Sequence, residues 1–442
     1  MSSRRLGPSH QDGMFETRDH RALVIRSGRI IDPFLNRDGV ADLALADGVI
    51  VADPPAGAEE LDASGWIISP GLIDMHVHLR EPGQTHKETI ATGTAAAAAG
   101  GFTAVACMPN TTPPLDSPEA VRFVIEQARS AGQCEVWPIA AVTKARQGSA
   151  LSDFEALRDA GAAAFSDDGT GVEDDAVMRA AFIRARDLDV VLIQHCEYRR
   201  LSAGGVMHLG DVSHRLGLPG LDPRSEEAMI DRDIGLCRRT RGRYHVAHIS
   251  TARAVEMVRR AKADGVPVTA EVTPHHLLLT HEACETRDPN TKMHPPLRTN
   301  DDVDACRRGL VDGTIDCIAT DHAPHAAEEK ARGFVQAPPG IIGLETAIGL
   351  VARGMIEPGI ADWPDLIRWF SAGPAGVLKR DRPTTAIGQS ANLTLIAASD
   401  AWEVNPERLL SKSRNTPFAG WRLIGRPVGT VRGTHVTVQK HP

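Results

Sequence analysis

The feature that most constrains this chain is an alternation of short apolar runs with amphipathic segments, from about residue 70 to about residue 380. Short apolar runs bounded by turn residues predict buried strands, and segments with a helical period predict helices between them. Strands that alternate with helices in this way indicate βα units and a parallel sheet. Eight runs fit the strand pattern: residues 71–78, 102–108, 135–143, 162–167, 190–196, 244–249, 268–273 and 316–320.

The segments between these runs predict the helices of the repeat. Ser117, Asp153 and Thr251 stand where N-caps are expected, and glycines follow several of the predicted helices, as is usual at helix ends. Eight βα units close into an α/β fold of the TIM type, a (β/α)8 barrel with its reactive groups at the carboxyl ends of the strands. The predicted helices are residues 88–99, 117–131, 153–160, 175–188, 225–240, 251–263 and 301–311.

Both ends of the chain follow a different pattern, because their apolar residues alternate with polar ones. A period of two is typical of strands with one buried face, and Ser27-Gly28 and Asp47-Gly48 are hairpin-type dipeptides. We therefore predict a small β-sandwich domain built from both termini. The expected organisation is a flexible tail (1–20), sandwich strands (21–69), a metal-dependent barrel (70–381) and the remaining sandwich strands (382–442).

Composition excludes several kinds of partner. The net charge is -8 and no run of Lys or Arg is interleaved with aromatics, so no nucleic-acid partner is expected. No apolar stretch approaches the ~20 residues that span a bilayer. The polar start of the chain lacks a secretory signal, and Met14 is a second candidate start. Seven scattered cysteines without C-x-x-C spacing favour reduced thiols and a cytoplasmic location.

Histidines and aspartates gather at the ends of the predicted barrel strands. His76 and His78 are two residues apart, so a strand places both imidazoles on one face. The carboxyl ends of all strands meet at one mouth of a barrel, where His and Asp side chains could form a catalytic zinc site with a position left for water. The other candidates are Asp167, Asp168, His195, His245, His248, Asp321 and His325.

Two choices stay open on spacing alone. His245 and His248 are three residues apart and face opposite sides of a regular strand, so we expect only one of them to bind metal. His248, nearer the end of the strand, is the better candidate. Asp167 and Asp168 pose the same choice, and periodicity does not decide between them.

Longer motifs resemble those of the amidohydrolase superfamily, and those of class I dihydroorotases in particular. The resemblance extends over nearly the whole chain after residue 20. The motif PGLIDMHVHLR (70–80) is shared across the superfamily, whereas the segments Met-Pro-Asn and Phe-Ser-Asp-Asp-Gly are more specific. The motifs are PGLIDMHVHLR (70–80), GGFTAVACMPNT (100–111), FSDDG (165–169), ATDHAPH (319–325) and SKSRNTP (411–417).

The resemblance implies the ligands of one or two Zn2+ ions. Many relatives bridge two metals with a carboxylated lysine, but residues 162–169 contain no lysine. An aspartate takes that place in class I dihydroorotases, and Asp168 corresponds to it here. The implied ligands are His76, His78, Asp168, His195, His248 and Asp321.

The resemblance also implies the contacts to a small-molecule substrate. A guanidinium and amide or imidazole donors suit the free carboxylate of dihydroorotate. Relatives usually have Asn-Pro-Pro-Leu-Arg where this chain has His294-Pro295-Pro296-Leu297-Arg298, so the role of the usual asparagine is open here. The implied contacts are His78, Arg80, Asn110, His294, His325 and the backbone at Pro339 and Gly340.

The implied reaction is the reversible, zinc-dependent cyclisation of N-carbamoyl-L-aspartate to (S)-dihydroorotate in pyrimidine biosynthesis. Zinc lowers the pKa of a bound water from ~15.7 towards ~7, so a metal-bound hydroxide is the expected nucleophile and Asp321 the general acid and base.

Two alternatives are another cyclic amidohydrolase, such as a hydantoinase or allantoinase, and a non-catalytic dihydroorotase-like subunit of aspartate transcarbamoylase. The missing lysine, with Arg80 and Asn110 present, argues against the first, and the complete ligand set argues against the second. A homodimer, and association of an active enzyme with aspartate transcarbamoylase, are both compatible with the sequence.

Overall fold

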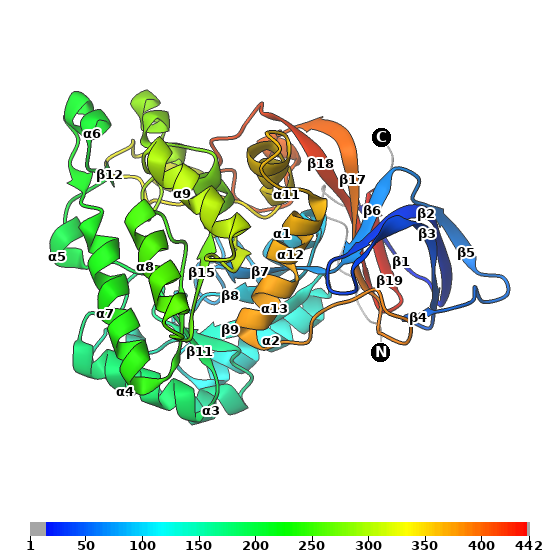
Figure 1. The fold of residues 1–442 in the computed structure, drawn as a ribbon, viewed down its shortest axis with the longest axis horizontal. Helices are drawn as coiled ribbons and strands as arrows, with labels where there is room; N and C mark the ends of the chain where they lie inside the picture. Colours follow the sequence, from blue (N-terminus) through cyan, green and yellow to red (C-terminus); the bar gives the residue numbers. More distant parts are fainter. Residues whose placement is uncertain (1–14, 440–442) are drawn as a thin grey trace, which may run out of the picture.

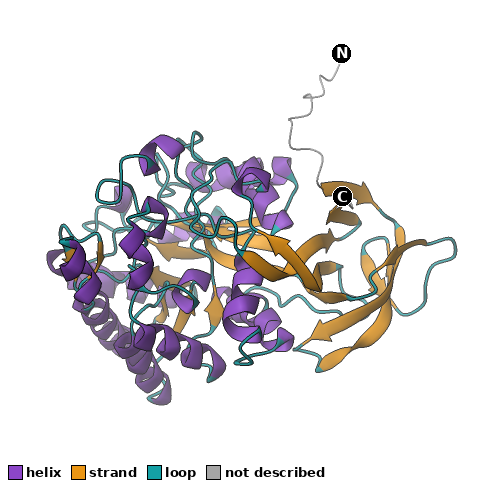
Figure 2. Cartoon of the chain, turned by 90° about the horizontal axis from the view of Figure 1, so that it is seen from above, coloured by secondary structure: helices purple, strands orange, loops and turns teal. Residues whose placement is uncertain are grey.

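The computed structural model describes residues 15–439, and its larger part is a barrel of eight parallel strands. The strands follow the order β16-β15-β14-β11-β10-β9-β8-β7, and helices surround them (Figures 1 and 2). The predicted (β/α)8 fold is confirmed. The barrel strands are β7 Leu72–Val77, β8 Phe102–Cys107, β9 Glu135–Ala140, β10 Ala164–Ser166, β11 Val191–Gln194, β14 Arg243–Val246, β15 Val268–Val272 and β16 Cys317–Ile318.

All the predicted helices are present, and Ser117, Asp153 and Thr251 cap their N-termini by accepting backbone hydrogen bonds. The sequence prediction missed α12 and α13 at the end of the barrel. Prolines lie near the start of both, where a missing N–H costs little. The outer helices are α1 Ile90–Ala99, α2 Pro118–Ala131, α3 Phe154–Asp159, α4 Asp175–Asp187, α7 Arg224–Thr240, α8 Ala252–Ala263, α9 Asn300–Val311, α12 Trp363–Phe370 and α13 Ala372–Leu378.

The barrel closes where β7 meets the end of β16. His78 N donates a hydrogen bond to His322 O at 2.8 Å. The buried carboxylate of Asp74 accepts from Thr320 N at 3.1 Å, from Thr320 Oγ1 at 2.5 Å and from His76 N at 3.1 Å. Asp74 therefore joins the first and last strands beside two of the predicted metal ligands.

A second sheet contains strands from both ends of the chain. Its order is β1-β19-β18-β17-β6-β2-β3-β4, with β5 paired to β2. β6 pairs with β17, so the segment before the barrel lies beside the segment after it (Figure 1). The predicted β-domain built from both termini is confirmed, with its own apolar cluster. The strands are β1 Phe15–Asp19, β2 Ala22–Asp32, β3 Arg37–Ala46, β4 Val49–Val51, β5 Glu59–Asp62, β6 Trp66–Pro70, β17 Asn392–Glu403, β18 Arg422–Arg432 and β19 His435–Gln439.

Two details of this domain differ from the sequence prediction. Residues 15–19, assigned to a flexible tail, form β1 because they pair with β19 along their whole length, whereas residues 1–14 lie outside the described residues. Ser27-Gly28 is not a hairpin turn but a bulge within β2, where the pairing with β3 shifts register. A bulge accommodates the positive φ of Ser27, 58°, without ending the strand. Asp47-Gly48 does connect β3 to β4.

No helix within residues 15–439 is long and apolar enough to cross a bilayer.

A buried ion pair holds the turn that follows β14. Glu226 of α7 accepts hydrogen bonds from Ser250 N at 2.9 Å and Thr251 N at 3.2 Å. The same carboxylate pairs with Arg298 Nη2 at 3.0 Å, and both side chains are at most 3% exposed. Because this turn directly follows His248, the ion pair fixes the backbone next to a predicted ligand.

Replacing Glu226 with Ala should destabilise the protein strongly, because the guanidinium of Arg298 would stay buried without its carboxylate. We expect a loss of about 3–5 kcal/mol in the free energy of unfolding, measured by denaturant titration. The matched control is Glu227→Ala, since among residues 15–439 Glu227 pairs only with the exposed Arg253, and its loss should be under about 1 kcal/mol. Equal losses in the two variants would contradict the structural role of the ion pair.

Candidate metal centre

Six His and Asp side chains meet at the carboxyl end of the barrel. They come from the ends of five strands, and all six residues are buried. His248 and Asp321 adopt positive φ angles of 33° and 49°, a backbone strain that concentrates at functional sites. The six are His76 and His78 at the end of β7, Asp168 after β10, His195 after β11, His248 after β14 and Asp321 after β16.

Asp168 lies at the centre of this group. Its Oδ1 is 3.4 Å from His76 Nε2 and 3.7 Å from both His195 Nδ1 and His248 Nε2. Its Oδ2 is 3.6 Å from His78 Nε2. Burial raises the pKa of Asp168, but the surrounding imidazoles, His76 first, lower it well below its usual range. The carboxylate is therefore charged and shared by imidazoles on both sides.

The remaining members form pairs on either side of Asp168. Asp321 Oδ1 is 3.0 Å from His78 Nε2 and 3.5 Å from His76 Nε2. On the other side, His195 Nδ1 and His248 Nε2 are 3.0 Å apart. Asp168 thus connects a first set, His76, His78 and Asp321, with a second set, His195 and His248.

The arrangement fits a divalent metal. Zinc ligands at ~2.0–2.2 Å in tetrahedral geometry lie ~3.3–3.6 Å from one another, close to the separations found here. His76 Nε2 and Asp168 Oδ1 are buried and have no hydrogen-bond partner among residues 15–439. Buried polar atoms without partners are costly, so a bound cation would supply what both atoms lack. The two sets around Asp168 could hold one ion or two.

Hydrogen bonds behind the imidazoles turn their nitrogens towards this centre. His76 Nδ1 donates to Glu271 Oε1 at 2.6 Å, and His78 Nδ1 donates to Asn110 Oδ1 at 2.8 Å. Each ring therefore presents the lone pair of Nε2 to the centre, the usual arrangement behind metal-binding histidines.

A third contact behind the imidazoles involves His294, the residue that stands where relatives usually have asparagine. His195 Nε2 is 3.3 Å from Glu197 Oε2, and His294 Nε2 is 2.9 Å from the same oxygen. Burial raises the pKa of Glu197, but the two imidazoles beside it, His195 first, lower it far below its usual range. Glu197 thereby orients His195, and His294 orients Glu197.

The structure shows which member of each pair, His245 or His248 and Asp167 or Asp168, faces the centre. His245 is bound to Thr269 Oγ1 at 2.8 Å and Glu271 at 3.2 Å, whereas His248 lies at the centre. Asp167 accepts hydrogen bonds from the backbone and hydroxyl of Thr143, so its carboxylate is used away from the centre.

The predicted substrate contacts lie on the surrounding loops. Arg80 Nε donates to Pro324 O at 3.1 Å, and its terminal nitrogens have no partner within the described chain. Burial lowers the pKa of Arg80 to about 10, against the attraction of Asp321 and Asp168. His325 Nε2 donates to Pro339 O at 2.9 Å. The unpaired end of the guanidinium is thus available to an anionic ligand.

Sequence reasoning missed three residues that organise the centre. Glu271 and Glu197 orient the imidazoles, and Asn415 joins two loops by donating to Ala323 O at 2.9 Å and Gly340 O at 3.1 Å. Glu271 did carry a signal, because an acid within the apolar strand Val-Thr-Ala-Glu-Val needs a buried partner.

Comparison with solved structures defines the class of fold. The L-hydantoinase of Arthrobacter aurescens superposes with a TM-score of 0.82 at 23% identity, covering 94% of this chain and 95% of the other. The D-hydantoinase of a Thermus species gives a TM-score of 0.78 at 25% identity, covering 94% of each chain. The barrel and its sheet domain are therefore those of the hydantoinase-type cyclic amidohydrolases.

Comparison of sequences is more specific. A family described as "Dihydro-orotase-like" matches residues 65–254. The dihydroorotase of Pelotomaculum thermopropionicum is 48% identical over 94% of this chain and 98% of its own length. That of Solibacter usitatus is 47% identical over 92% of this chain and 96% of its own length. The chain belongs to the dihydroorotase family.

Replacing Asp168 with Ala should remove the larger part of the bound metal, because this carboxylate contacts both ligand sets. Asp167→Ala should retain most of it, since Asp167 is bonded to Thr143 instead. Elemental analysis of both variants, purified side by side with the wild type, measures the difference. A larger metal loss in Asp167→Ala would show that the wrong carboxylate had been assigned.

Proposed function

We propose that this protein is a zinc-dependent dihydroorotase that interconverts (S)-dihydroorotate and N-carbamoyl-L-aspartate in pyrimidine biosynthesis. The observation that carries the proposal is the buried centre around Asp168, an aspartate where many cyclic amidohydrolases need a lysine, in a chain of the dihydroorotase family. The ligands are His76, His78, Asp168, His195, His248 and Asp321.

Arg80 is the residue we assign to the substrate carboxylate. Its terminal nitrogens have no protein partner among residues 15–439, and a guanidinium can hold a carboxylate through two parallel hydrogen bonds. Because Arg80 follows His78 by two residues, it holds the substrate carboxylate at a fixed place relative to the proposed metal ligands. We assign the remaining contacts to His78, Asn110, His294, His325, Pro339 and Gly340.

Asp321 is the proposed general acid and base. A bound divalent metal activates water and polarises the ring carbonyl. The Oδ1 of Asp321 faces His78, whereas its Oδ2 has no hydrogen-bond partner among the described residues and can accept a proton. Asp321 takes a proton from the attacking water and delivers it to the ring nitrogen as the amide bond breaks. Cyclisation uses the same residue in reverse.

Other parts of the proposal depend more on the family than on geometry. Zinc suits the His and Asp donors, and the seven cysteines are free and buried, which fits a cytoplasmic location. A homodimer, a complex with aspartate transcarbamoylase, and the division into 21–69, 70–381 and 382–442 are also proposed. Gel filtration with and without aspartate transcarbamoylase tests the assembly.

The direct test is hydrolysis of dihydroorotate by protein of known metal content, with hydantoin and allantoin as controls. We expect turnover of dihydroorotate alone. Preference for hydantoin or allantoin would indicate a different cyclic amidohydrolase, and absence of turnover in metal-loaded protein would indicate a non-catalytic subunit.

Asp321→Asn should nearly abolish turnover without changing the fold, because an amide cannot accept the proton and binds metal more weakly. We expect kcat to fall more than tenfold, about 1.4 kcal/mol in the barrier. Asp304→Asn, the same change on an exposed position of α9, should leave kcat unaltered. Retention of more than about a tenth of the wild-type kcat in Asp321→Asn would argue against the assignment.

His294→Ala tests the residue that departs from the family motif. Its Nε2 faces Glu197, which leaves Nδ1 for the substrate. We expect a higher KM, by roughly 0.5–1.5 kcal/mol for a neutral hydrogen bond and up to ~3 kcal/mol for a charged one. His294→Asn should restore most of this loss. Metal content, measured in parallel, separates a substrate contact from an effect through Glu197. A kcat/KM within twofold of wild type in the Ala variant would exclude the contact.

A further inference from the structure

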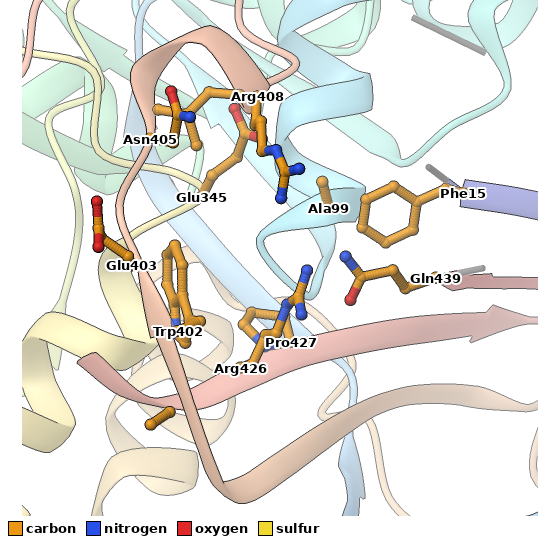
Figure 3. A pocket seen from close by; sticks show the side chains of 12 residues that line it. Phe15, Ala99, Glu345, Trp402, Glu403, Asn405, Arg408, Arg426, Pro427 and Gln439 are labelled. Atoms are coloured by element: carbon orange, nitrogen blue, oxygen red, sulfur yellow. The ribbon is translucent and has the colours of Figure 1, made fainter. Parts of the chain in front are cut away.

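A cavity of about 420 Å³ lies between the sheet domain and the barrel, apart from the metal centre. Residues of β1, β17, β18 and β19 line one side, and Ala99 at the end of α1 and Glu345 line the other (Figure 3). None of the proposed metal ligands or substrate contacts lines it. The volume is in the range of small-molecule sites, about 300–1,000 Å³.

Two arginines point their guanidinium groups into this cavity. Arg408 ends the short helix Pro406–Arg408 and Arg426 belongs to β18 (Figure 3). Neither side chain makes an ion pair or hydrogen bond with any residue from 15 to 439. Burial lowers the pKa of Arg426, and the charge of Arg408 lowers it further against the attraction of Asp400. Arg426 is half-buried and Arg408 is exposed, so both guanidinium groups are accessible to an anion that enters the cavity.

The two acids that line the cavity, Glu345 and Glu403, do not pair with these arginines. Glu345 accepts hydrogen bonds from Leu410 N at 2.9 Å and Ser411 N at 3.0 Å, and burial raises its pKa to about 7. The carboxylate of Glu403 is turned away from both guanidinium groups (Figure 3). Both guanidinium groups are therefore left for an anionic ligand.

The other walls suit a flat, polar ring. Trp402, Phe15 and Pro427 provide apolar surfaces, and the amides of Asn405 and Gln439 border the same space (Figure 3). Asn405 Oδ1 accepts from Glu407 N at 3.0 Å, which leaves its NH₂ group for another acceptor. Aromatic faces pack against planar rings, and amides bond to their polar edges.

We propose that this cavity is a binding site for a nucleoside monophosphate. The phosphate lies between Arg408 and Arg426, because guanidinium groups bind phosphate oxygens through paired, charge-assisted hydrogen bonds. The base lies against the aromatic side. The site is separate from the metal centre, and its occupation does not depend on the proposed reaction.

Calorimetric titration of the full-length, metal-loaded protein tests the proposal, with uridine 5′-monophosphate and adenosine 5′-monophosphate as probes. We expect one site per chain with a Kd below about 1 mM for at least one nucleotide. Inorganic phosphate should bind more weakly, and uridine without phosphate should not bind measurably. Affinity for phosphate equal to that for both nucleotides, or no nucleotide binding, would overturn the proposal.

Arg408→Gln and Arg426→Gln should each weaken nucleotide binding about tenfold or more, about 1.4 kcal/mol or more. The matched control, Arg422→Gln, removes an exposed arginine of the same strand outside the cavity, and should change the Kd less than twofold. All three variants should keep the wild-type melting temperature and dihydroorotate turnover. Nucleotide binding that survives both substitutions, or that dihydroorotate displaces competitively, would place the nucleotide elsewhere and refute the site.

Discussion

The carboxylate of Asp74 joins the two ends of the barrel, and the geometry of the candidate metal centre depends on that connection. β7 and the segment after β16 share only an isolated bridge between Val77 and His322, so side-chain hydrogen bonds contribute much of the closure. Asp74 holds the backbone of His76 and of Thr320, the residue before Asp321. Burial raises its pKa to about 7, although those hydrogen bonds lower it. A ligand from the first strand is thereby held next to one from the last.

A second layer of carboxylates compensates the concentration of imidazoles at the centre. Glu271 accepts from His76 and His245, and it lies 3.3 Å from the backbone nitrogen of His248. Glu197 similarly accepts from His195 and lies 2.9 Å from His294 Nε2. Each acid fixes which nitrogen of a ring carries the proton, and so prepares the opposite nitrogen to bind a cation.

The sequence was sufficient to predict the eight barrel strands and the six His and Asp side chains that the structure brings together, because each of these residues follows an apolar run in a fold that gathers all strand ends. It did not reveal which imidazoles the acids behind them orient, and for Glu271 that pairing is decided across the barrel, since His76 and Glu271 are 195 positions apart. The sequence also predicted a hairpin turn at Ser27-Gly28 and a flexible tail that included residues 15–19. Strand pairing overrides both, because it makes Ser27 part of a bulge and residues 15–19 the strand β1. Prolines near the start of α12 and α13 concealed two helices.

The pairing of β6 with β17 has a consequence for the order in which the chain can fold during synthesis. Ser69 and Thr394 lie side by side although 325 positions separate them. Barrel units contact their sequence neighbours and can assemble as they emerge, whereas β6 must wait for β17 before its second edge is paired. Until then the apolar faces of Ile25 and Ile30 lack part of their cover. A nascent or truncated chain is therefore exposed to aggregation through the very sheet that completes the mature protein.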